Sequence, residues 1–255
     1  MKNLVIGNTS QLSYYFPNDY IKISSRDINF TEEQYDRVYI CFAEQRTYIT
    51  DDKNLFYDTN INYTLKVIDH FYKYCNKIII YATSELWNKH NGFINMDTPF
   101  NYKSTDYIDT KMLLIQYVKY KYRDKIIILY PFNFNSVHRK HGFLFYKIFD
   151  SIIYNKKIEI GDTYFYRELL HPKFVVEQSI NSETDTIIGS GRLTFVNDFI
   201  RNLYSYFNMN YDDYVYENLS NRSQNSIFYL ESKHVLYNEL FDDTISELVK
   251  LKNNI

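Results

Sequence analysis

The chain has 255 residues, enough for one large domain or two smaller ones that share a core. Its formal net charge of −2 lacks the basic excess of bulk nucleic-acid binders. No apolar run reaches the length of a membrane span, and no signal peptide is recognisable. The cysteines, Cys41 and Cys75, and the scattered histidines have no metal-ligand spacing. We therefore expect a reduced, cytoplasmic protein with no metal site and no nucleic-acid or membrane partner.

Short apolar runs alternate along the chain with longer segments of helical periodicity. Uninterrupted apolar runs are typical of strands that are buried on both faces. In chain order, the expected strands are 4–6, 20–23, 38–42, 78–81, 126–130 and 187–188. The expected helices are 11–16, 60–74, 107–122, 143–154, 195–207 and 242–251. This alternation predicts an α/β fold with a parallel sheet and right-handed crossovers.

The first strand runs into a turn and then into the first expected helix. Such a strand–turn–helix can hold a pyrophosphate at the helix N-terminus, where free N–H groups and the helix dipole favour anions. The usual fingerprint has three glycines, but here only Gly7 is present, and Ser10 and Ser13 take the other positions. An ordinary capped turn is equally consistent with these residues. The candidate cofactor contacts in this segment are Gly7, Ser10, Gln11 and Leu12.

The second expected strand ends in Ser24-Ser25-Arg26. In a dinucleotide-binding fold the tip of this strand meets the adenosine ribose, and hydroxyls with an arginine suit a 2′-phosphate. Ser24 and Arg26 therefore favour NADP over NAD, although a surface turn with one solvated arginine is the alternative. Ala43, which follows the strand 38–42, is a further candidate cofactor contact.

Tyr107 and Lys111 lie one helical turn apart at the start of an expected helix. A nearby cation favours the phenolate, and a tyrosine tuned in this way can exchange a proton with a carbinol. The same spacing recurs at Tyr117/Lys121 and at Tyr229/Lys233. Only Tyr107 follows a strand, 78–81, that ends in a hydroxyl residue, Thr83, able to bind the same substrate oxygen.

These motifs resemble those of extended short-chain dehydrogenase/reductases, the NAD-dependent epimerase/dehydratase family. Thr83, Tyr107 and Lys111 match the family's Ser/Thr and Tyr-x-x-x-Lys triad. Thr83-Ser84-Glu85-Leu86 followed by Thr98-Pro99-Phe100 is most similar to the GDP-mannose 4,6-dehydratase branch. The shorter N-terminal part looks more like dTDP-4-dehydrorhamnose reductases. Further matches to the dehydratase branch lie at 132–139, 161–162, 167–173 and 222–223.

The resemblance implies a role for each matching residue. Thr83 and Tyr107 would hold the sugar 4-hydroxyl, with Tyr107 as the acid/base. Lys111 would bind the nicotinamide ribose and lower the tyrosine pKa. Glu85 would remove the proton at the sugar 5-position so that water leaves from the 6-position. The implied substrate contacts are Ser84, Asn133, Arg167 and Arg222, and Arg139 would contact the cofactor, NADP or NAD, or a neighbouring subunit.

The resemblance also implies a Rossmann-type, doubly wound sheet with a small C-terminal substrate-binding α/β subdomain. We expect residues 1–130, with 174–190 returning to them, to form the NAD(P)-binding domain. Residues 131–173 and 191–255 would form the substrate-binding subdomain. The partner molecules would be a nucleotide sugar, used for surface polysaccharide biosynthesis, and a second copy of the chain in a homodimer.

Several departures from the family pattern leave other activities open. Gly7 stands alone in the first turn, and Trp87 and Asn88 replace a tyrosine and a glycine of the dehydratase motif. Epimerisation or 4-keto reduction would use Thr83, Tyr107 and Lys111 without needing Glu85. A dinucleotide-binding module that has lost its chemistry is the alternative outside enzyme function, since fold does not determine function.

Overall fold

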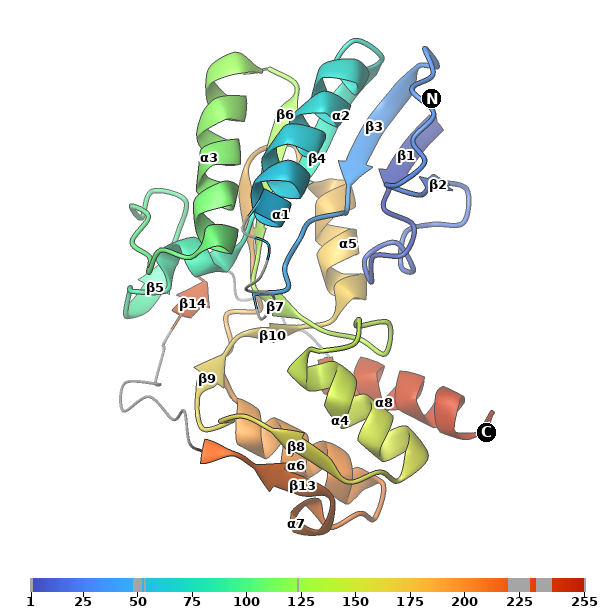
Figure 1. Cartoon of the computed structure of the whole chain (residues 1–255), viewed down its shortest axis with the longest axis vertical. Coiled ribbons are helices and arrows are strands. Elements are labelled where there is room, and N and C mark those ends of the chain that lie inside the picture. The colour runs from blue at the N-terminus through green and yellow to red at the C-terminus, as the bar shows by residue number, and fades with distance from the viewer. Residues whose placement is uncertain are drawn as a thin grey trace.

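The computed structural model describes residues 2–47, 52, 54–122, 124–219, 230–232 and 240–254. Its centre is a parallel sheet whose strands follow the order β11-β6-β4-β3-β1-β2 (Figure 1). Their bounds are β1 (Lys2–Ile6), β2 (Ile21–Ile23), β3 (Tyr35–Ile40), β4 (Cys75–Tyr81), β6 (Ile126–Pro131) and β11 (Thr186–Ile188). The strand order reverses at β1, so the carboxyl ends of β1 and β3 form the switch point where such sheets bind ligands. The predicted parallel, Rossmann-type α/β fold is confirmed.

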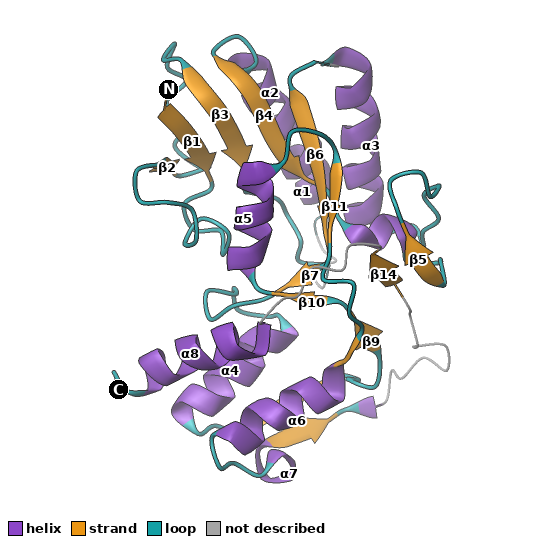
Figure 2. Ribbon diagram, turned by 180° about the vertical axis from the view of Figure 1, so that it is seen from behind, coloured by secondary structure: helices purple, strands orange, loops and turns teal. Residues whose placement is uncertain are grey.

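Helices cover both faces of this sheet (Figures 1 and 2). One face carries α1 (Asn54–Tyr57), the π-helical η1 (Asp58–Tyr63), α2 (Thr64–Phe71) and α3 (Asp106–Lys121). The other face carries α5 (Pro172–Asn181). Between these layers, the strand residues Val5, Val38 and Ile79 are fully buried in one apolar cluster. The expected helix at 60–74 therefore exists, but the helical segment begins at Asn54 and ends at Phe71.

The segment between β1 and β2 differs from the expectation, because residues 7–20, all described, contain no helix. Residues 8–16 form consecutive tight turns, in which the N–H of Ser10 donates to the Gly7 carbonyl at 2.8 Å and that of Ser13 to the Ser10 carbonyl at 3.0 Å. The Ser13 hydroxyl also donates to the Gly7 carbonyl, at 2.6 Å, and such local bonds compete with helix formation. Leu12 and Phe16 have helical spacing but reach the core from these turns. The predicted helix 11–16 was wrong.

A second group of elements lies beside the carboxyl edge of the sheet, in the lower half of Figure 1. It has its own apolar core, which includes Ile148, Ile200 and Leu248. We call this group lobe 2, and the predicted helices 143–154, 195–207 and 242–251 are confirmed in it. Its helices are α4 (Leu144–Tyr154), α6 (Val196–Tyr206), α7 (Tyr211–Tyr214) and α8 (Leu240–Lys252). Its paired strands are β8 (Ile158–Ile160) with β13 (Val215–Glu217), and β9 (Tyr166–Arg167) with β12 (Thr194–Phe195).

Short elements connect the sheet to lobe 2. β7 (Asn133–Phe134) pairs with β10 (Leu169–Leu170), and β5 (Gly92–Ile94) pairs with β14 (Leu230–Ser232). The 3₁₀ helix η2 (Ser84–Trp87) follows β4 directly. Of the helices described, none has the length and apolar character needed to cross a bilayer. The described His, Cys, Asp and Glu side chains form no cluster of three or more that could bind a metal.

Candidate active site

The turn after β4 places Thr83 at the carboxyl edge of the sheet. Thr83 is the N-cap of η2, and its hydroxyl accepts the N–H of Glu85 at 3.2 Å. Behind this turn, the indole N–H of Trp87 donates to the Thr98 carbonyl at 2.9 Å, and the Trp87 ring packs on Phe100 at 4.9 Å. Residues 98–100 therefore hold the turn in place through their contacts with Trp87. Ser84, predicted to bind substrate, is 2% exposed and forms part of this support.

Helix α3 brings Tyr107 and Lys111 to the same place. Thr105 caps the helix by accepting the N–H of Ile108 at 3.2 Å, so Tyr107 lies in the first turn and Lys111 one turn later. The Lys111 ammonium donates to the Tyr81 carbonyl at the end of β4, at 2.7 Å, and lies 5.9 Å from the centre of the Tyr107 ring. The Thr83 hydroxyl lies close enough to the Tyr107 phenol to lower its pKa. The structure thus brings Thr83, Tyr107 and Lys111 together at one strand end.

The electrostatics of this group differ from the expectation. Burial raises the pKa of Tyr107 to about 12, and the Glu85 charge adds to the increase, while Thr83 and Arg139 act in the opposite direction. Burial also lowers the pKa of Lys111 to about 8. The expected lowering of the tyrosine pKa by Lys111 is therefore not found. The physical reason is that the lysine is itself desolvated and directs its ammonium to a backbone carbonyl.

The charges of Glu85 and Arg167 act on each other at this site. Burial lowers the pKa of Arg167, and the Glu85 carboxylate partly offsets that shift, which shows that the two charges interact. The Arg167 guanidinium donates to the Tyr166 carbonyl at 2.9 Å and packs 5.0 Å from the centre of the Phe165 ring. Asn133 lies on β7, opposite Leu169 of β10, and is partly buried. Lobe 2 therefore contributes a cation to a site whose other residues come from the turn after β4, from α3 and from β7.

The residues predicted at the first turn have different surroundings. Gly7 has φ +109°, and a Cβ added there would lie 3.2 Å from the carbonyl carbon of Cys41, so only glycine fits beside the end of β3. The Ser10 hydroxyl accepts the N–H of Leu12 at 3.4 Å. The Leu12 side chain is buried in the core, and the Gln11 amide bonds the backbone of Phe134. Any cofactor contact from Gln11 or Leu12 would therefore come from the backbone.

Basic side chains from three segments gather at the cofactor side of the switch point. Arg26 follows β2, Arg46 follows β3, and Arg139 and Lys140 lie between β7 and α4. Desolvation lowers the pKa of Lys140, and the charges of Arg26, Arg46 and Arg139 lower it further, against a smaller opposite effect of Glu44. Like charges repel, so such a cluster suits an anionic ligand. Arg26 and Arg139 were predicted from the sequence, whereas Arg46 and Lys140 were not.

Two further predicted contacts flank this basic cluster. Ser24 accepts the N–H of Arg26 at 3.1 Å and shapes the tip of β2. Ala43 is partly buried in the loop after β3. The next residue, Glu44, forms an ion pair with Arg46 at 2.5 Å.

Asn60 was not predicted, yet it connects the loop after β3 with the start of α3. It is 1% exposed inside the π-helical η1. Its side chain accepts the Glu44 N–H at 2.7 Å and donates to the Glu44 carbonyl at 3.1 Å, and it also donates to the Thr110 hydroxyl at 3.2 Å. Thr110 in turn donates to the Tyr107 carbonyl at 2.9 Å. This chain of bonds couples the loop after β3 to the turn that carries Tyr107.

The second Tyr-x-x-x-Lys motif on α3, Tyr117 with Lys121, lies away from this site. Lys121 forms an ion pair with Asp69 at 2.8 Å at the far end of α3, where Tyr117 is exposed. Tyr229 and Lys233 lie outside the described residues, as does Arg222.

The parallel sheet, its switch point and the Thr–Tyr–Lys group define a Rossmann-type α/β protein with its site at the carboxyl edge. The chain belongs to the NAD dependent epimerase/dehydratase family, whose model matches residues 15–177. No protein of curated function matches the sequence.

Solved structures resemble the whole chain. RMD from Pseudomonas aeruginosa, complexed with NADPH, is 10% identical with a TM-score of 0.80, and the match covers 100% of both chains. A double mutant of DesIV, the dTDP-glucose 4,6-dehydratase of Streptomyces venezuelae with NAD and DAU bound, is 12% identical with a TM-score of 0.79, covering 99% of this chain and 97% of that one. UDP-glucose 4-epimerase from Thermotoga maritima, with UDP-glucose, is 16% identical with a TM-score of 0.77, covering 98% and 99%. At these identities the likeness shows the fold.

Proposed function

We propose that this protein is an NADP-dependent enzyme that converts a nucleotide-activated sugar through a 4-keto intermediate, as a 4,6-dehydratase. The observation that carries the proposal is the meeting of Thr83, Tyr107, Lys111 and Glu85 at the end of β4. Structures of similar fold hold NAD or NADPH, and several hold nucleotide sugars. A role in surface polysaccharide biosynthesis is part of the same proposal.

The residues at the switch point fit a nicotinamide dinucleotide. Gly7 has φ +109° and lets the chain pass tightly beside the Cys41 backbone, the close turn after the first strand that a dinucleotide-binding fold requires. Arg26, Arg46 and Lys140 supply positive charge for the phosphates. When bound, the nicotinamide ring would accept a hydride from the sugar and return it. Lys111, at the end of β4, is the residue that would hold the nicotinamide ribose.

The protein's own groups would handle the protons. Thr83 would orient the sugar 4-hydroxyl toward Tyr107, which exchanges its proton. With a pKa of about 12, the Tyr107 phenol is protonated at neutral pH, the form that returns a proton to a 4-keto oxygen. Arg167 lies on the lobe 2 side of Glu85, where it would bind the diphosphate.

Glu85 favours a dehydratase over a simple epimerase. Its charge acts on both Tyr107 and Arg167, so we place it near the proposed positions of the sugar 4-oxygen and the diphosphate. A base at this point can remove the proton at the sugar 5-position. Epimerisation or 4-keto reduction would need no such carboxylate.

We predict that Glu85→Gln blocks loss of the 6-hydroxyl but leaves oxidation at the 4-position. The amide keeps the size of the side chain and cannot act as a base, so the 5-proton should exchange with solvent about 10²-fold more slowly. Mass spectrometry of the product and of its solvent deuterium would measure both steps. Asn88→Ala is the matched control, because Asn88 donates to the Glu85 carboxylate at 3.3 Å without being a base. Normal dehydration by Glu85→Gln would remove the argument for a dehydratase.

We also predict that Arg26→Ala weakens NADPH binding more than NADH binding. Arg26 lies at the tip of β2, beside the position expected for the ribose 2′-phosphate, and loss of one phosphate contact should weaken NADPH binding about tenfold. Titration with each cofactor would measure the two dissociation constants. Equal weakening of both would contradict the NADP assignment.

One observation favours a second candidate, a dinucleotide-binding module without catalysis. The helix that usually holds the pyrophosphate is replaced by the turns at 8–16. Such a module would bind NADPH but leave nucleotide hexoses unchanged, so product analysis separates it from the enzyme.

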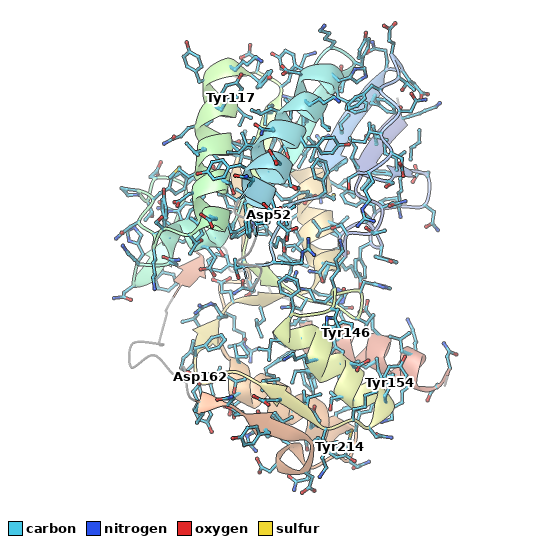
Figure 3. The ribbon with its side chains drawn as sticks, viewed as in Figure 1. Asp52, Tyr117, Tyr146, Tyr154, Asp162 and Tyr214 are labelled. Carbon is cyan, nitrogen blue, oxygen red and sulfur yellow. The ribbon has the colours of Figure 1, made fainter. Side chains whose placement is uncertain are left out.

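We propose a second copy of this chain as the partner of α3. This helix exposes Leu113, Tyr117 and Tyr120, the last of them 78% exposed, and Tyr57 of α1 is exposed as well. Figure 3 shows Tyr117 on the upper half of α3, away from lobe 2. Exposed apolar patches on helices are typical of subunit interfaces.

A further inference from the structure

The turns at residues 8–16 have no helical hydrogen-bond ladder, so contacts from elsewhere determine their shape. Gln11 is 6% exposed, and its amide donates to the Phe134 carbonyl and accepts the Ser136 N–H, both at 3.2 Å. The Tyr14 ring stacks flat on His138, with 3.7 Å between ring centres. The segment between β7 and α4, which leads into lobe 2, therefore supports the turn that follows β1.

Glu247 of α8 joins this support at a single carboxylate. One of its oxygens accepts the Tyr15 hydroxyl. The other lies 3.3 Å from the ring nitrogen of His171, the N-cap of α5, and accepts the Val137 N–H at 3.4 Å. The His171 side chain is 1% exposed and the Glu247 side chain 19%. Figure 2 shows α8 beyond the end of α5 that faces lobe 2.

This carboxylate is held in its charged form. Burial raises the pKa of Glu247, but its contacts with His171 and Tyr15 outweigh burial and bring the pKa below its usual value. A charged, nearly enclosed acceptor makes stronger hydrogen bonds than a neutral one. The Tyr15 ring also lies edge-on to His171, with 5.0 Å between centres, so the contact has little freedom to rearrange.

We propose that Glu247 is a positioning residue for the dinucleotide, which acts from lobe 2 by holding the turn between Gly7 and Phe16 in its binding shape. The inference rests on the proposed function, because it assigns that turn to the cofactor pyrophosphate. A helix after β1 would normally hold this segment in shape. Here the Ser13 hydroxyl bonds the Gly7 carbonyl, and Glu247 holds Tyr15, two residues further along, through its hydroxyl. Cofactor affinity in this chain therefore depends on a helix more than two hundred residues away in sequence.

The test compares NADPH dissociation constants of the full-length protein and three variants. Glu247→Gln keeps the size of the side chain and removes its charge, and Tyr15→Phe removes a single hydroxyl. We expect each to weaken NADPH binding about tenfold. The double variant should bind NADPH no more weakly than either single variant, because the two residues act as a unit. Asp243→Asn is the matched control: it removes a charge that acts on Tyr15 from a distance and disrupts the Lys173–Asp243 contact at 3.6 Å, which also joins α5 to α8. No hydrogen bond to the turn is lost, so NADPH affinity should stay near that of the wild type.

Urea unfolding of the cofactor-free variants distinguishes an effect on the shape of the turn from a loss of overall stability. Variants that unfold more readily but bind NADPH as the wild type does would overturn the inference, and so would additive effects of the two substitutions. If Glu247→Gln does not fold, Tyr15→Phe alone decides the matter by the same dissociation constant. If the wild-type protein does not bind NADPH, the proposed function itself is overturned. If the wild type binds NADPH and the variants bind it equally tightly, only the role of Glu247 is overturned.

Discussion

Tyr107→Phe is expected to reduce turnover of a nucleotide sugar by about 10²–10⁴-fold, the usual contribution of a general acid/base. The substitution removes only the phenol oxygen, which interacts with Thr83 and Glu85 at the end of β4. The ring remains in contact with the core cluster, so folding should be unchanged. NADPH affinity should also be unchanged, because the basic cluster and Gly7 are untouched. Product formation at saturating substrate, with a separate cofactor titration, measures both effects.

Tyr117→Phe is the matched control for this prediction. Tyr117 belongs to the second Tyr-x-x-x-Lys motif on the same helix, but it is exposed and its lysine forms an ion pair with Asp69. Its substitution should leave turnover at the wild-type rate. Wild-type turnover by Tyr107→Phe would show that the sugar is activated by another group.

Lys111→Met is expected to reduce activity about 10²-fold, the effect typical of removing one donor from an active site, without loss of stability at pH 7. Holding this ammonium in a buried position lowers its pKa from 10.5 to about 8, which costs the folded protein roughly 3 kcal/mol. Methionine removes that cost but leaves the Tyr81 carbonyl without its donor, a loss of about 1–3 kcal/mol. The free energy of unfolding should therefore equal or exceed that of the wild type. A residue that costs stability and is needed for activity is typical of a functional site.

The pH dependence of stability gives this prediction a second readout. Below pH 8 the lysine is protonated in both states, and the folded protein bears the full cost of the buried charge. Between pH 8 and 10.5 the folded protein has released the proton while the unfolded chain still holds it, so stability from this group rises with pH. The wild type should therefore gain free energy of unfolding relative to Lys111→Met over this range. Urea unfolding at pH 7 and pH 10 measures this gain in the free energy of unfolding. The control Lys121→Met replaces an exposed lysine and should show no such gain. A lower stability of Lys111→Met than of the wild type at pH 7 would contradict the argument.

The sheet could be predicted because its strands are buried on both faces. Runs such as Ile78 to Ile80 are at most 3% exposed and have no polar alternation, which distinguishes them from surface strands. The helix at 11–16 could not be judged in this way. Leu12 and Phe16 have the spacing of a helix face, but the serine hydroxyl that closes the turn on Gly7 provides a competing local structure.

The positions of the site residues could be predicted, but their electrostatics could not. Thr83, Tyr107 and Lys111 follow from a strand end and a helix start, which are local features of the sequence. The pKa shifts of Tyr107 and Lys111 arise from burial by elements distant in sequence. No local pattern contains that information.

The residues that could not be predicted from the sequence act through long-range contacts. Asn60 bonds the backbone of Glu44 and the side chain of Thr110, and an asparagine within a polar stretch carries no signal of such partners. Glu247 borders the buried face of α8, and a glutamate at that position carries no signal of its contacts with Tyr15 and His171. Short pairs such as β7 with β10 were missed for the same reason, because two-residue strands have no periodicity.

Rapid-mixing absorbance of the NADP-loaded wild-type protein with GDP-, dTDP- and UDP-hexoses tests the central claim most directly. With the right nucleotide hexose, the absorbance of reduced nicotinamide should rise and then fall within a single turnover, as the sugar is oxidised and reduced again around Tyr107. A protein that binds no dinucleotide, or one whose bound NADP stays oxidised with every hexose, would contradict the account.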